Sequence, residues 1–370
     1  MELPILTVPQ VGLDSFHDDR RKTRRVMVGN IAVGDGAPIS VQTMTKTKTG
    51  DVKATLEQIR RAEEAGVDIV RVTVNDWEAA EGIKDIVKGT KIPIVADIHI
   101  NHVFAIKALE AGVAKVRLNP GNIGSLDRIH QVLALAKERR TPIRIGVNSG
   151  SLEKDILEKH GYPTAEALFE SAMRHVEICE DFGFGDIIIS VKSTDVRLMI
   201  AAYRLIAERT DYPLHLGVTE AGTIRVGTIK SSIGIGTLLA EGIGDTIRVS
   251  LTDEPEKEVE VGKEILRSLS LASRNVEIIA CPTCGRLEID LFKVCDELEK
   301  KTAHYKKPVK VAILGCVVNG PGEAADADIG IAAGQGVGIL YRKGEVIRRI
   351  KEEEIVEVLL EEIENFQPQD

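Results

Sequence analysis

Three cysteines and one glutamate near the carboxyl end of the chain have the types and spacing of metal ligands. Cys281 and Cys284 form a Cys-x2-Cys pair, and Cys316 follows an apolar run typical of a buried strand. Glu323 lies seven residues later, beyond a Gly-Pro-Gly sequence at 320–322 that predicts a tight turn back toward the thiol. Three thiolates with a more easily displaced oxygen ligand suit an iron–sulfur cluster that acts on a substrate.

Other kinds of site stay open for these cysteines. A structural zinc site normally has four Cys or His ligands, so Cys295 or His304 would have to complete it. Cys295 lies in the middle of a predicted helix, and we expect it, like Cys179, to be a core thiol. A thioredoxin-like Cys-x-x-Cys pair needs no third cysteine. Structural zinc is therefore the alternative to a cluster.

A second set of chemical groups lies in and after short β-branched runs, which are nearly continuous in apolar residues, as strands buried on both faces are. We count eight such runs, at residues 38–45, 68–74, 92–98, 115–121, 142–148, 186–193, 214–222 and 246–252. Helical patterns separate them, and the clearest begins at Asp51, a candidate N-cap, and stops at Gly66. Eight strand–helix units predict a (β/α)8 TIM-type barrel. An open doubly wound sheet is the alternative.

Catalytic groups of such barrels lie at the carboxyl ends of the strands. Polar residues do cluster there, among them Asp97, Asn119, Asn148, Glu220 and Ser250. Cations lie within the predicted strands: Arg71, Arg117, Arg144, Lys192 and Arg248. A buried cation without a partner is costly, so each of them pairs with a carboxylate or faces an anionic ligand. As a set they predict a phosphate-rich substrate, because guanidinium groups bind phosphate oxygens in pairs.

The elements after the barrel predict a second, smaller domain, as the length of 370 residues also favours. Residues 253–271 have the pattern of a last barrel helix. Strands at 276–280 and 309–315, a hairpin and a terminal amphipathic helix follow, which together predict an α+β domain. We expect a barrel over residues 1–270 and a small domain over 271–370.

Composition argues against several classes of protein. The net charge of −9 disfavours binding to nucleic acid or to an anionic membrane, and we expect the one basic run, at 20–25, to be a solvated arm. No apolar stretch approaches the ~20 residues of a membrane span, and the first residues lack the pattern of a signal peptide. Five cysteines in such a chain indicate reduced thiols in the cytoplasm.

With these residues assembled, the chain closely resembles the IspG/GcpE family of the non-mevalonate (MEP) isoprenoid pathway, in its shorter bacterial two-domain form. The resemblance runs over nearly the whole chain, through "GDGAPISVQTMT", "NPGNIG", "IRIGVNSGSLEKD", "LHLGVTEAG", "CPTCGR" and "GCVVNGPGEA". One departure, "VQTMT" in place of the expected "VQSMT", touches no proposed ligand.

The resemblance implies roles for particular residues. One 4Fe-4S cluster would be bound by Cys281, Cys284, Cys316 and Glu323. The substrate would be 2-C-methyl-D-erythritol 2,4-cyclodiphosphate, and its diphosphate would be held by Arg71, Arg117, Arg144 and Lys192, assisted by Asn148 and Ser250. The catalytic carboxylates would be Glu220, facing the cluster from the barrel, and Glu323.

The resemblance also implies a two-electron reductive ring opening with loss of water, which yields 4-hydroxy-3-methylbut-2-enyl diphosphate. Ferredoxin or flavodoxin would supply the electrons, since no nicotinamide or flavin fingerprint stands out in the chain. A homodimer is implied in which the cluster domain of one subunit closes over the barrel of the other. Two other classes stay open: a non-redox barrel enzyme with a structural metal site, and an electron carrier whose barrel is only a scaffold.

Overall fold

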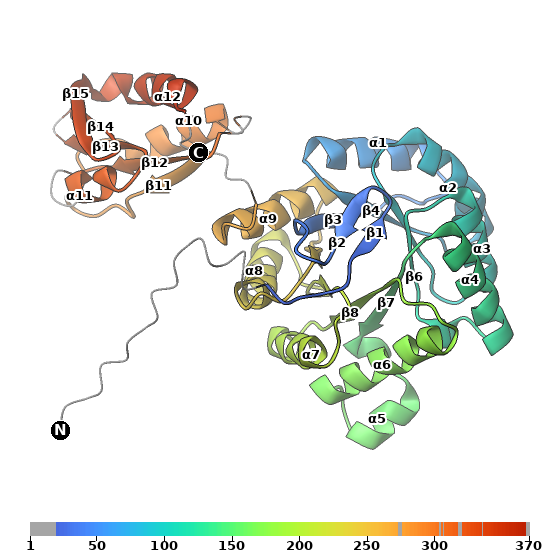
Figure 1. Ribbon diagram of the computed structural model, residues 1–370. Helices are drawn as coiled ribbons and strands as arrows, with labels where there is room; N and C mark the ends of the chain where they lie inside the picture. Colours follow the sequence, from blue (N-terminus) through green and yellow to red (C-terminus); the bar gives the residue numbers. More distant parts are fainter. Residues whose placement is uncertain are drawn as a thin grey trace, which may run out of the picture. The chain divides into compact units, whose positions relative to one another are not determined.

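The computed structural model describes residues 20–272, 276–302, 305, 307–316, 320–334 and 336–367 (Figure 1). The chain forms two compact units that divide between Ala272 and Ser273. Within the described residues, no helix is both long and apolar enough to cross a bilayer.

The first unit is a parallel eight-stranded barrel. Its strands are β3 (Ser40–Met44), β4 (Ile69–Thr73), β5 (Ile94–Asp97), β6 (Lys115–Arg117), β7 (Ile143–Asn148), β8 (Ile187–Lys192), β9 (His215–Leu216) and β10 (Thr246–Ile247). They pair in the order β8-β7-β6-β5-β4-β3-β10-β9, and a parallel bridge between Ile189 and Leu214 joins the two ends of this row. The predicted TIM-type barrel is confirmed, and the open sheet is excluded.

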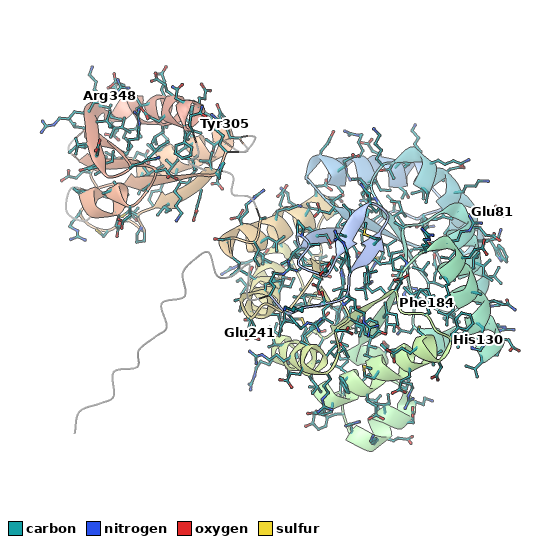
Figure 2. All side chains as sticks on the ribbon, viewed as in Figure 1. Glu81, His130, Phe184, Glu241, Tyr305 and Arg348 are labelled. Atoms are coloured by element: carbon teal, nitrogen blue, oxygen red, sulfur yellow. The ribbon has the colours of Figure 1, made fainter. Side chains whose placement is uncertain are left out.

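Helices alternate with these strands and surround the barrel (Figure 1). They are α1 (Val52–Glu64), α2 (Trp77–Gly89), α3 (His102–Ala111), α4 (Leu126–Arg139), α5 (Lys154–His160), α6 (Ala165–Asp181), α7 (Val196–Arg209), α8 (Ile224–Ala240) and α9 (Pro255–Ser268). As predicted, Asp51 caps α1, because its carboxylate accepts from the amide of Ala54 at 3.0 Å. Charged side chains such as Glu81 and Glu241 lie on the outside of the ring (Figure 2).

Alternation along the strands divides apolar from polar side chains. Outward positions such as Val70 and Val72 of β4 and Ile143 and Ile145 of β7 join the core beneath the helices. The intervening positions face the barrel interior. In most barrels these are bulky aliphatic residues, whereas here many are charged or polar, and this makes the interior the candidate site.

An amino-terminal hairpin packs against apolar side chains of the barrel strands. Its strands are β1 (Val26–Val28) and β2 (Ile31–Val33), and their valines pack on Ile69, Val95 and Ile188. The basic run before it is only partly the solvated arm that we expected, because Lys22, Arg24 and Arg25 are exposed whereas Arg20 and Arg21 are half-buried. Arg20 donates to the carbonyl of Ala37 at 2.7 Å and has a side chain only 9% exposed, and Arg21 donates to the carbonyls of Thr210 and Tyr212. These loop carbonyls accept hydrogen bonds from Arg20 and Arg21 and so hold the start of the run against the barrel.

The second unit has a mixed five-stranded sheet with helices on both faces. Its strands, in spatial order, are β11 (Val276–Ala280), β12 (Val309–Leu314), β13 (Ile329–Gly334), β14 (Val337–Arg342) and β15 (Glu345–Lys351). The first three are parallel, and β13, β14 and β15 are antiparallel. Helices α10 (Leu291–Thr302) and α12 (Ile355–Asn365) share one core, and the short α11 (Gly320–Ala325) packs on the other face. The predicted hairpin and terminal helix are confirmed, and β15 is an additional strand.

Candidate active site

Two arginines of the barrel interior share one carboxylate. Arg117 of β6 donates to Asp97 of β5 at 3.2 Å, and Arg71 of β4 lies 3.6 Å from the same carboxylate. Burial alone raises the pKa of Asp97, but Arg71 and Arg117 outweigh it and lower that pKa to about 2. Asp97 is therefore a fixed anion that holds two guanidinium groups side by side, with one negative charge for two positive ones.

Arg144 and Lys192 form no ion pair within the part of the chain that the structure describes. Arg144 of β7 is 1% exposed and donates only to the hydroxyl of Ser190, at 3.0 Å, while its Nε and Nη2 have no partner there. Lys192, at the end of β8, is 6% exposed. Burial, followed by the neighbouring arginines, holds the pKa values of both side chains well below their usual range. Unsatisfied buried cations of this kind need an anionic ligand.

Two glycines make room for these cations inside the barrel. A Cβ atom at Gly146 of β7 would lie 2.5 Å from Nε of Arg117, and one at Gly217, just after β9, would lie 3.1 Å from Nζ of Lys192. Arg117 also donates to the carbonyl of Gly146 at 2.7 Å. Glycine therefore stands at the positions where the long side chains of Arg117 and Lys192 pass over the neighbouring backbone.

Arg248 is held differently from the other cations. It lies 3.2 Å from Glu258 of α9, a carboxylate 1% exposed that also accepts from the hydroxyl of Thr43 at 2.7 Å and from the amide of Leu251 at 3.1 Å. A carboxylate with this many donors is a structural partner. For Arg248 the salt-bridge interpretation is therefore the one that the structure supports.

The three remaining barrel candidates lie around the carboxyl ends of the strands. Asn148 pairs in register with Lys192 and is half-buried, as is Ser250. Glu220 is exposed, accepts from the hydroxyl of Thr194 at 3.4 Å and has a φ of 51°. A left-handed backbone is unfavourable for glutamate, and such strain is found most often at functional sites.

A buried histidine holds two loops at this end of the barrel. His175 of α6 is 2% exposed; its Nδ1 accepts from the amide of Gly121 at 3.2 Å, and its Nε2 lies 3.0 Å from the carboxylate of Glu153. Gly121 belongs to the "NPGNIG" loop and Glu153 to the "SLEKD" loop. The amide donor at Nδ1 places the ring proton on Nε2, facing Glu153.

The three cysteines of the predicted metal site follow the ends of two neighbouring parallel strands. Cys281 comes directly after β11 and is half-buried, Cys284 lies in the exposed loop beyond it, and Cys316 follows β12 and is buried. The amide of Thr283 donates to Sγ of Cys281 at 3.4 Å. Hydrogen bonds from the amide and the guanidinium group of Arg286 lower the pKa of Cys284. Donors that stabilise thiolates fit iron–sulfur ligation.

Glu323 lies on a short helix, so the predicted turn at 320–322 is wrong. These residues form the first turn of α11, where proline needs no amide partner and where a Cβ at Gly320 would crowd Ala332 at 3.0 Å. Glu323 itself is exposed. Among the described residues, no three His, Cys, Asp or Glu side chains are gathered to hold a metal ion. The described candidate ligands are therefore not preassembled around a metal position in the second unit. His304 lies outside the described residues.

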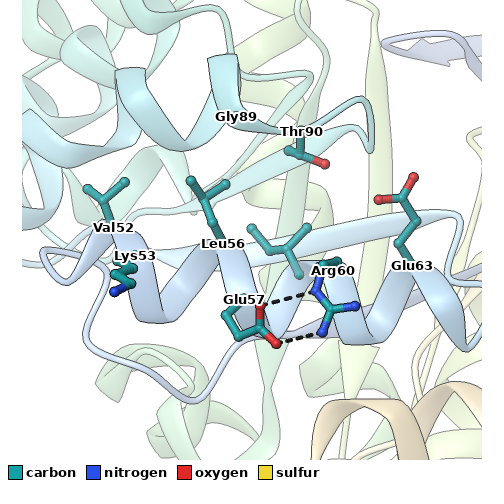
Figure 3. Close-up of a pocket in the computed structure, with 9 residues that line it drawn as sticks. Val52, Lys53, Leu56, Glu57, Arg60, Glu63, Gly89 and Thr90 are labelled. Carbon is teal, nitrogen blue, oxygen red and sulfur yellow. Dashed lines mark hydrogen bonds and ion pairs between the residues drawn. The ribbon is translucent and has the colours of Figure 1, made fainter.

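The structure also has shallow pockets on the outer surface, away from the barrel interior. One lies between α1 and the end of α2 and is lined by Val52 and Leu56 of α1, its ion pair Glu57–Arg60, and Thr90 (Figure 3). A second lies along α7, around Asp195, Arg197 and Arg204. Neither contains any of the interior cations, so neither competes with the barrel as the site of chemistry.

Comparison with known proteins places both units in one family. The GcpE TIM-barrel domain matches residues 23–263, and the GcpE protein C-terminal domain matches residues 277–365. This chain belongs to the GcpE family. It is 56% identical over 348 residues to the 4-hydroxy-3-methylbut-2-en-1-yl diphosphate synthase (flavodoxin) of Clostridium perfringens, which covers 94% of this chain and 100% of that relative. The enzyme of the same name from Clostridium acetobutylicum is 57% identical over 347 residues, 94% of this chain and 99% of the relative.

Among solved structures, a dihydropteroate synthase from Xanthomonas albilineans matches 67% of this chain and 98% of its own, with a TM-score of 0.49 and 14% identity. The family resemblance that the motifs predicted is confirmed by the matches to GcpE-family domains and relatives.

Sequence reasoning missed part of the barrel interior of this GcpE-family chain. Lys115 and His215 are 0% exposed, and neither Nζ of Lys115 nor either ring nitrogen of His215 has a described hydrogen-bond partner. Gln42 of β3 is equally buried and unsatisfied. The available signal was the period of two: Lys115 precedes Arg117 by two residues, and His215 precedes Gly217 by two, so each shares the interior face.

Proposed function

We propose that this chain is a 4-hydroxy-3-methylbut-2-en-1-yl diphosphate synthase, an iron–sulfur oxidoreductase of the MEP pathway that acts on 2-C-methyl-D-erythritol 2,4-cyclodiphosphate. Membership of the GcpE family supports this over both units. The observation that carries the proposal is the surplus of cations inside the barrel, where Arg144 and Lys192 have no carboxylate partner among the described residues. A cyclic diphosphate supplies the missing negative charge.

The reaction breaks two carbon–oxygen bonds. Ring opening frees one diphosphate oxygen from carbon, and the loss of a hydroxyl group releases water. Written for the neutral acids, two electrons and two protons convert the cyclodiphosphate into the linear product and water. Negative charge grows on the freed diphosphate oxygen as the ring opens, so cations that are already in place lower the barrier.

The interior side chains of the barrel would hold the diphosphate. Arg71 and Arg117 are oriented by Asp97, whereas Arg144 has two nitrogens without a described partner and Lys192 forms no ion pair with the described residues. Asn148 and Ser250, at the strand ends, would bind the remaining oxygens of the substrate. Glu220 would serve as the catalytic carboxylate of the barrel, with its orientation set by Thr194 and by its strained backbone.

The second unit would hold the cluster, which assigns substrate binding to residues 1–270 and cluster binding to residues 271–370. Cys281, Cys284, Cys316 and Glu323 would be the four ligands of one 4Fe-4S cluster, as the thiol positions and the hydrogen bonds to sulfur support. When bound, the cluster would supply electrons one at a time and a Lewis-acidic iron for the departing oxygen. Reduced thiols of this kind suit the cytoplasm.

Two partners complete the proposal. The relatives named above carry flavodoxin in their names, so we assign flavodoxin, with ferredoxin as the second candidate, as the electron donor. The other partner is a second copy of the chain. Val226, Ile229 and Ile233 form one exposed apolar stripe on α8, with 47%, 54% and 53% of each residue accessible. A helix that is apolar on its outer face as well as its inner face is typical of one covered in an assembly.

Anaerobic purification followed by iron, sulfide and zinc analysis tests the cluster. We expect about four irons per chain, and stoichiometric zinc without iron would favour the non-redox alternative. Turnover of the cyclodiphosphate with reduced flavodoxin tests the activity. A brown, iron-loaded protein that leaves the cyclodiphosphate unchanged would instead be an electron carrier.

A further inference from the structure

Lys115 is a lysine buried in the barrel interior, and no carboxylate of the described residues forms an ion pair with it. It begins β6, pairs in register with Val95 and is 0% exposed. Val95 packs against the valines of the β1–β2 hairpin, as does the neighbouring Ala114, so the hairpin separates this part of the interior from solvent. The Nζ atom of Lys115 has no hydrogen-bond partner among the described residues.

The described charged groups that act on Lys115 from the surrounding strands are cations. Arg144 on β7 and Arg71 on β4 are the charged neighbours that lower the pKa of Lys115 most. Lys115 in turn lowers the pKa of His215 on β9. On its own strand Lys115 is followed, two residues later, by Arg117. The carboxylate on β5, Asp97, already binds Arg71 and Arg117.

This arrangement disfavours the charged form of Lys115 in the free enzyme. Burial, followed by repulsion from Arg144 and Arg71, holds the pKa of Lys115 well below its usual value. Burial, followed by Arg144, Lys192 and Lys115, does the same to the pKa of His215. Burial and the neighbouring cations therefore favour the uncharged form of both side chains while the barrel contains no anion.

We propose that Lys115 takes up a proton from solvent when a diphosphate binds to the arginines beside it, so that substrate binding is coupled to proton uptake. This inference rests on the proposed function, because it assumes a diphosphate ligand at Arg71, Arg117 and Arg144. The step forms one N–H bond on the amine and changes no oxidation state. The resulting ammonium ion is stabilised by the negative charge that has entered the barrel.

A direct consequence concerns the pH dependence of affinity. A complex that binds more protons than the free enzyme becomes weaker as pH rises, and one linked proton changes the dissociation constant by up to tenfold per pH unit. Lys115→Met should remove the Lys115 share of this dependence while keeping most of the volume of the side chain. It should also fold, because it removes an unpaired buried amine.

Calorimetric titration measures the proton uptake directly. The oxidised holoenzyme, kept anaerobic and without reductant so that no turnover occurs, is titrated with the cyclodiphosphate in two buffers of different ionisation enthalpy. We expect the native protein to take up as much as one proton more than Lys115→Met near neutral pH. Lys88→Met, an exposed lysine on α2, should match the native protein. Equal uptake by the native protein and Lys115→Met would overturn the proposal, and Lys115→Leu repeats the comparison with a second apolar side chain.

Inorganic pyrophosphate separates this inference from the proposed function. If pyrophosphate binds with Lys115-dependent proton uptake but the cyclodiphosphate does not bind, the proposed substrate is wrong and the proton coupling stands. If the cyclodiphosphate binds and turns over but Lys115→Met leaves proton uptake unchanged, the proposed function stands and the role of Lys115 is refuted.

Discussion

At the scale of single residues, the interior cations differ in what holds them. Arg248 has a carboxylate with several other donors, and Arg71 and Arg117 share Asp97. Among the described residues, Arg144 has only a neutral partner, the hydroxyl of Ser190. A side chain that is buried without a counter-charge costs stability, and such a cost is retained where the same group has a function.

Arg144→Met should therefore stabilise the free enzyme and weaken substrate binding. We expect a gain of about 1 kcal/mol in the free energy of unfolding, because an unpaired guanidinium is replaced by an apolar side chain. Substrate affinity should fall roughly 30-fold, equivalent to the ~2 kcal/mol of a charge-assisted hydrogen bond. Denaturant unfolding and substrate titration measure the two effects, and iron content should not change.

Arg248→Met is the matched control for this pair of effects. It removes the nearer of the two cations beside buried Glu258, since Lys46 lies 3.9 Å away, so it should destabilise the fold by about 3 kcal/mol. If Arg144→Met loses stability to the same extent, Arg144 is a structural residue and its assignment to the substrate is wrong.

The cysteines permit a comparison within one residue type. Cys281→Ser, Cys284→Ser and Cys316→Ser should each lose the visible absorption of the cluster, its iron and all activity. Cys179→Ala and Cys295→Ala should keep all three, since Cys179 lies in the barrel core and Cys295 packs against the core of the second unit. Cys179→Ala should cost about 1 kcal/mol of stability through the small cavity it leaves. Loss of iron from Cys295→Ala would contradict the ligand assignment.

At the scale of elements, the strands of the barrel act as spacers as well as supports. The interior face of β7 carries Arg144, then Gly146, then Asn148. Arg117 crosses from β6 at the place where Gly146 has no side chain, and the carbonyl of Gly146 also accepts from the side-chain amide of Asn119 at 3.1 Å. The position of one cation therefore depends on a glycine in the next strand.

Gly146→Ala should displace Arg117 without unfolding the barrel. The new Cβ would lie 2.5 Å from Nε, so the guanidinium must move by roughly 1 Å, and kcat/KM should fall 10- to 100-fold. Gly185→Ala is the control, because its Cβ would meet only Arg24, at 3.9 Å, and its effect on stability should stay within about 0.5 kcal/mol. Steady-state kinetics on both variants makes the comparison, and native kinetics in Gly146→Ala would show that Arg117 does not act at the site.

At the scale of the whole molecule, the two units carry different halves of the proposed chemistry. The barrel unit has the cations and Glu220, and the second unit has the three thiols and Glu323. Turnover requires both halves to meet at one substrate. A homodimer with exchanged halves meets this requirement through two equivalent composite sites, as closed two-fold symmetry demands.

Mixing two inactive variants tests that arrangement. Glu220→Gln disables the barrel half and Cys316→Ser disables the cluster half. After random subunit exchange about half of the dimers are mixed, and each has one intact site of two, so activity should recover to at most about a quarter of the native value. Native mass spectrometry should verify the exchange. Full exchange without recovered activity would mean that each site is built within one chain.

Much of this organisation was accessible from the sequence, because it depends on local patterns. Runs of β-branched residues alternate with helical patterns, and Asp51 begins α1 by bonding an amide three residues away. The cysteine spacing and the motifs of the family were equally visible, since short-range order and residue type need no knowledge of distant partners. These features were enough to predict eight strand–helix repeats, a division of the chain into two domains, and a site that binds an anion.

Only the tertiary structure decided which groups meet. The bridge between Ile189 and Leu214 closes the barrel. Which arginines have a carboxylate partner depends on Asp97, which lies twenty residues from Arg117 along the chain. The hairpin against the barrel strands and the burial of Lys115 are also products of distant segments packing together. A local pattern shows that a cation faces the barrel interior. Whether a carboxylate pairs with that cation depends on strand register and on which strands are neighbours, and both exist only once the chain has folded.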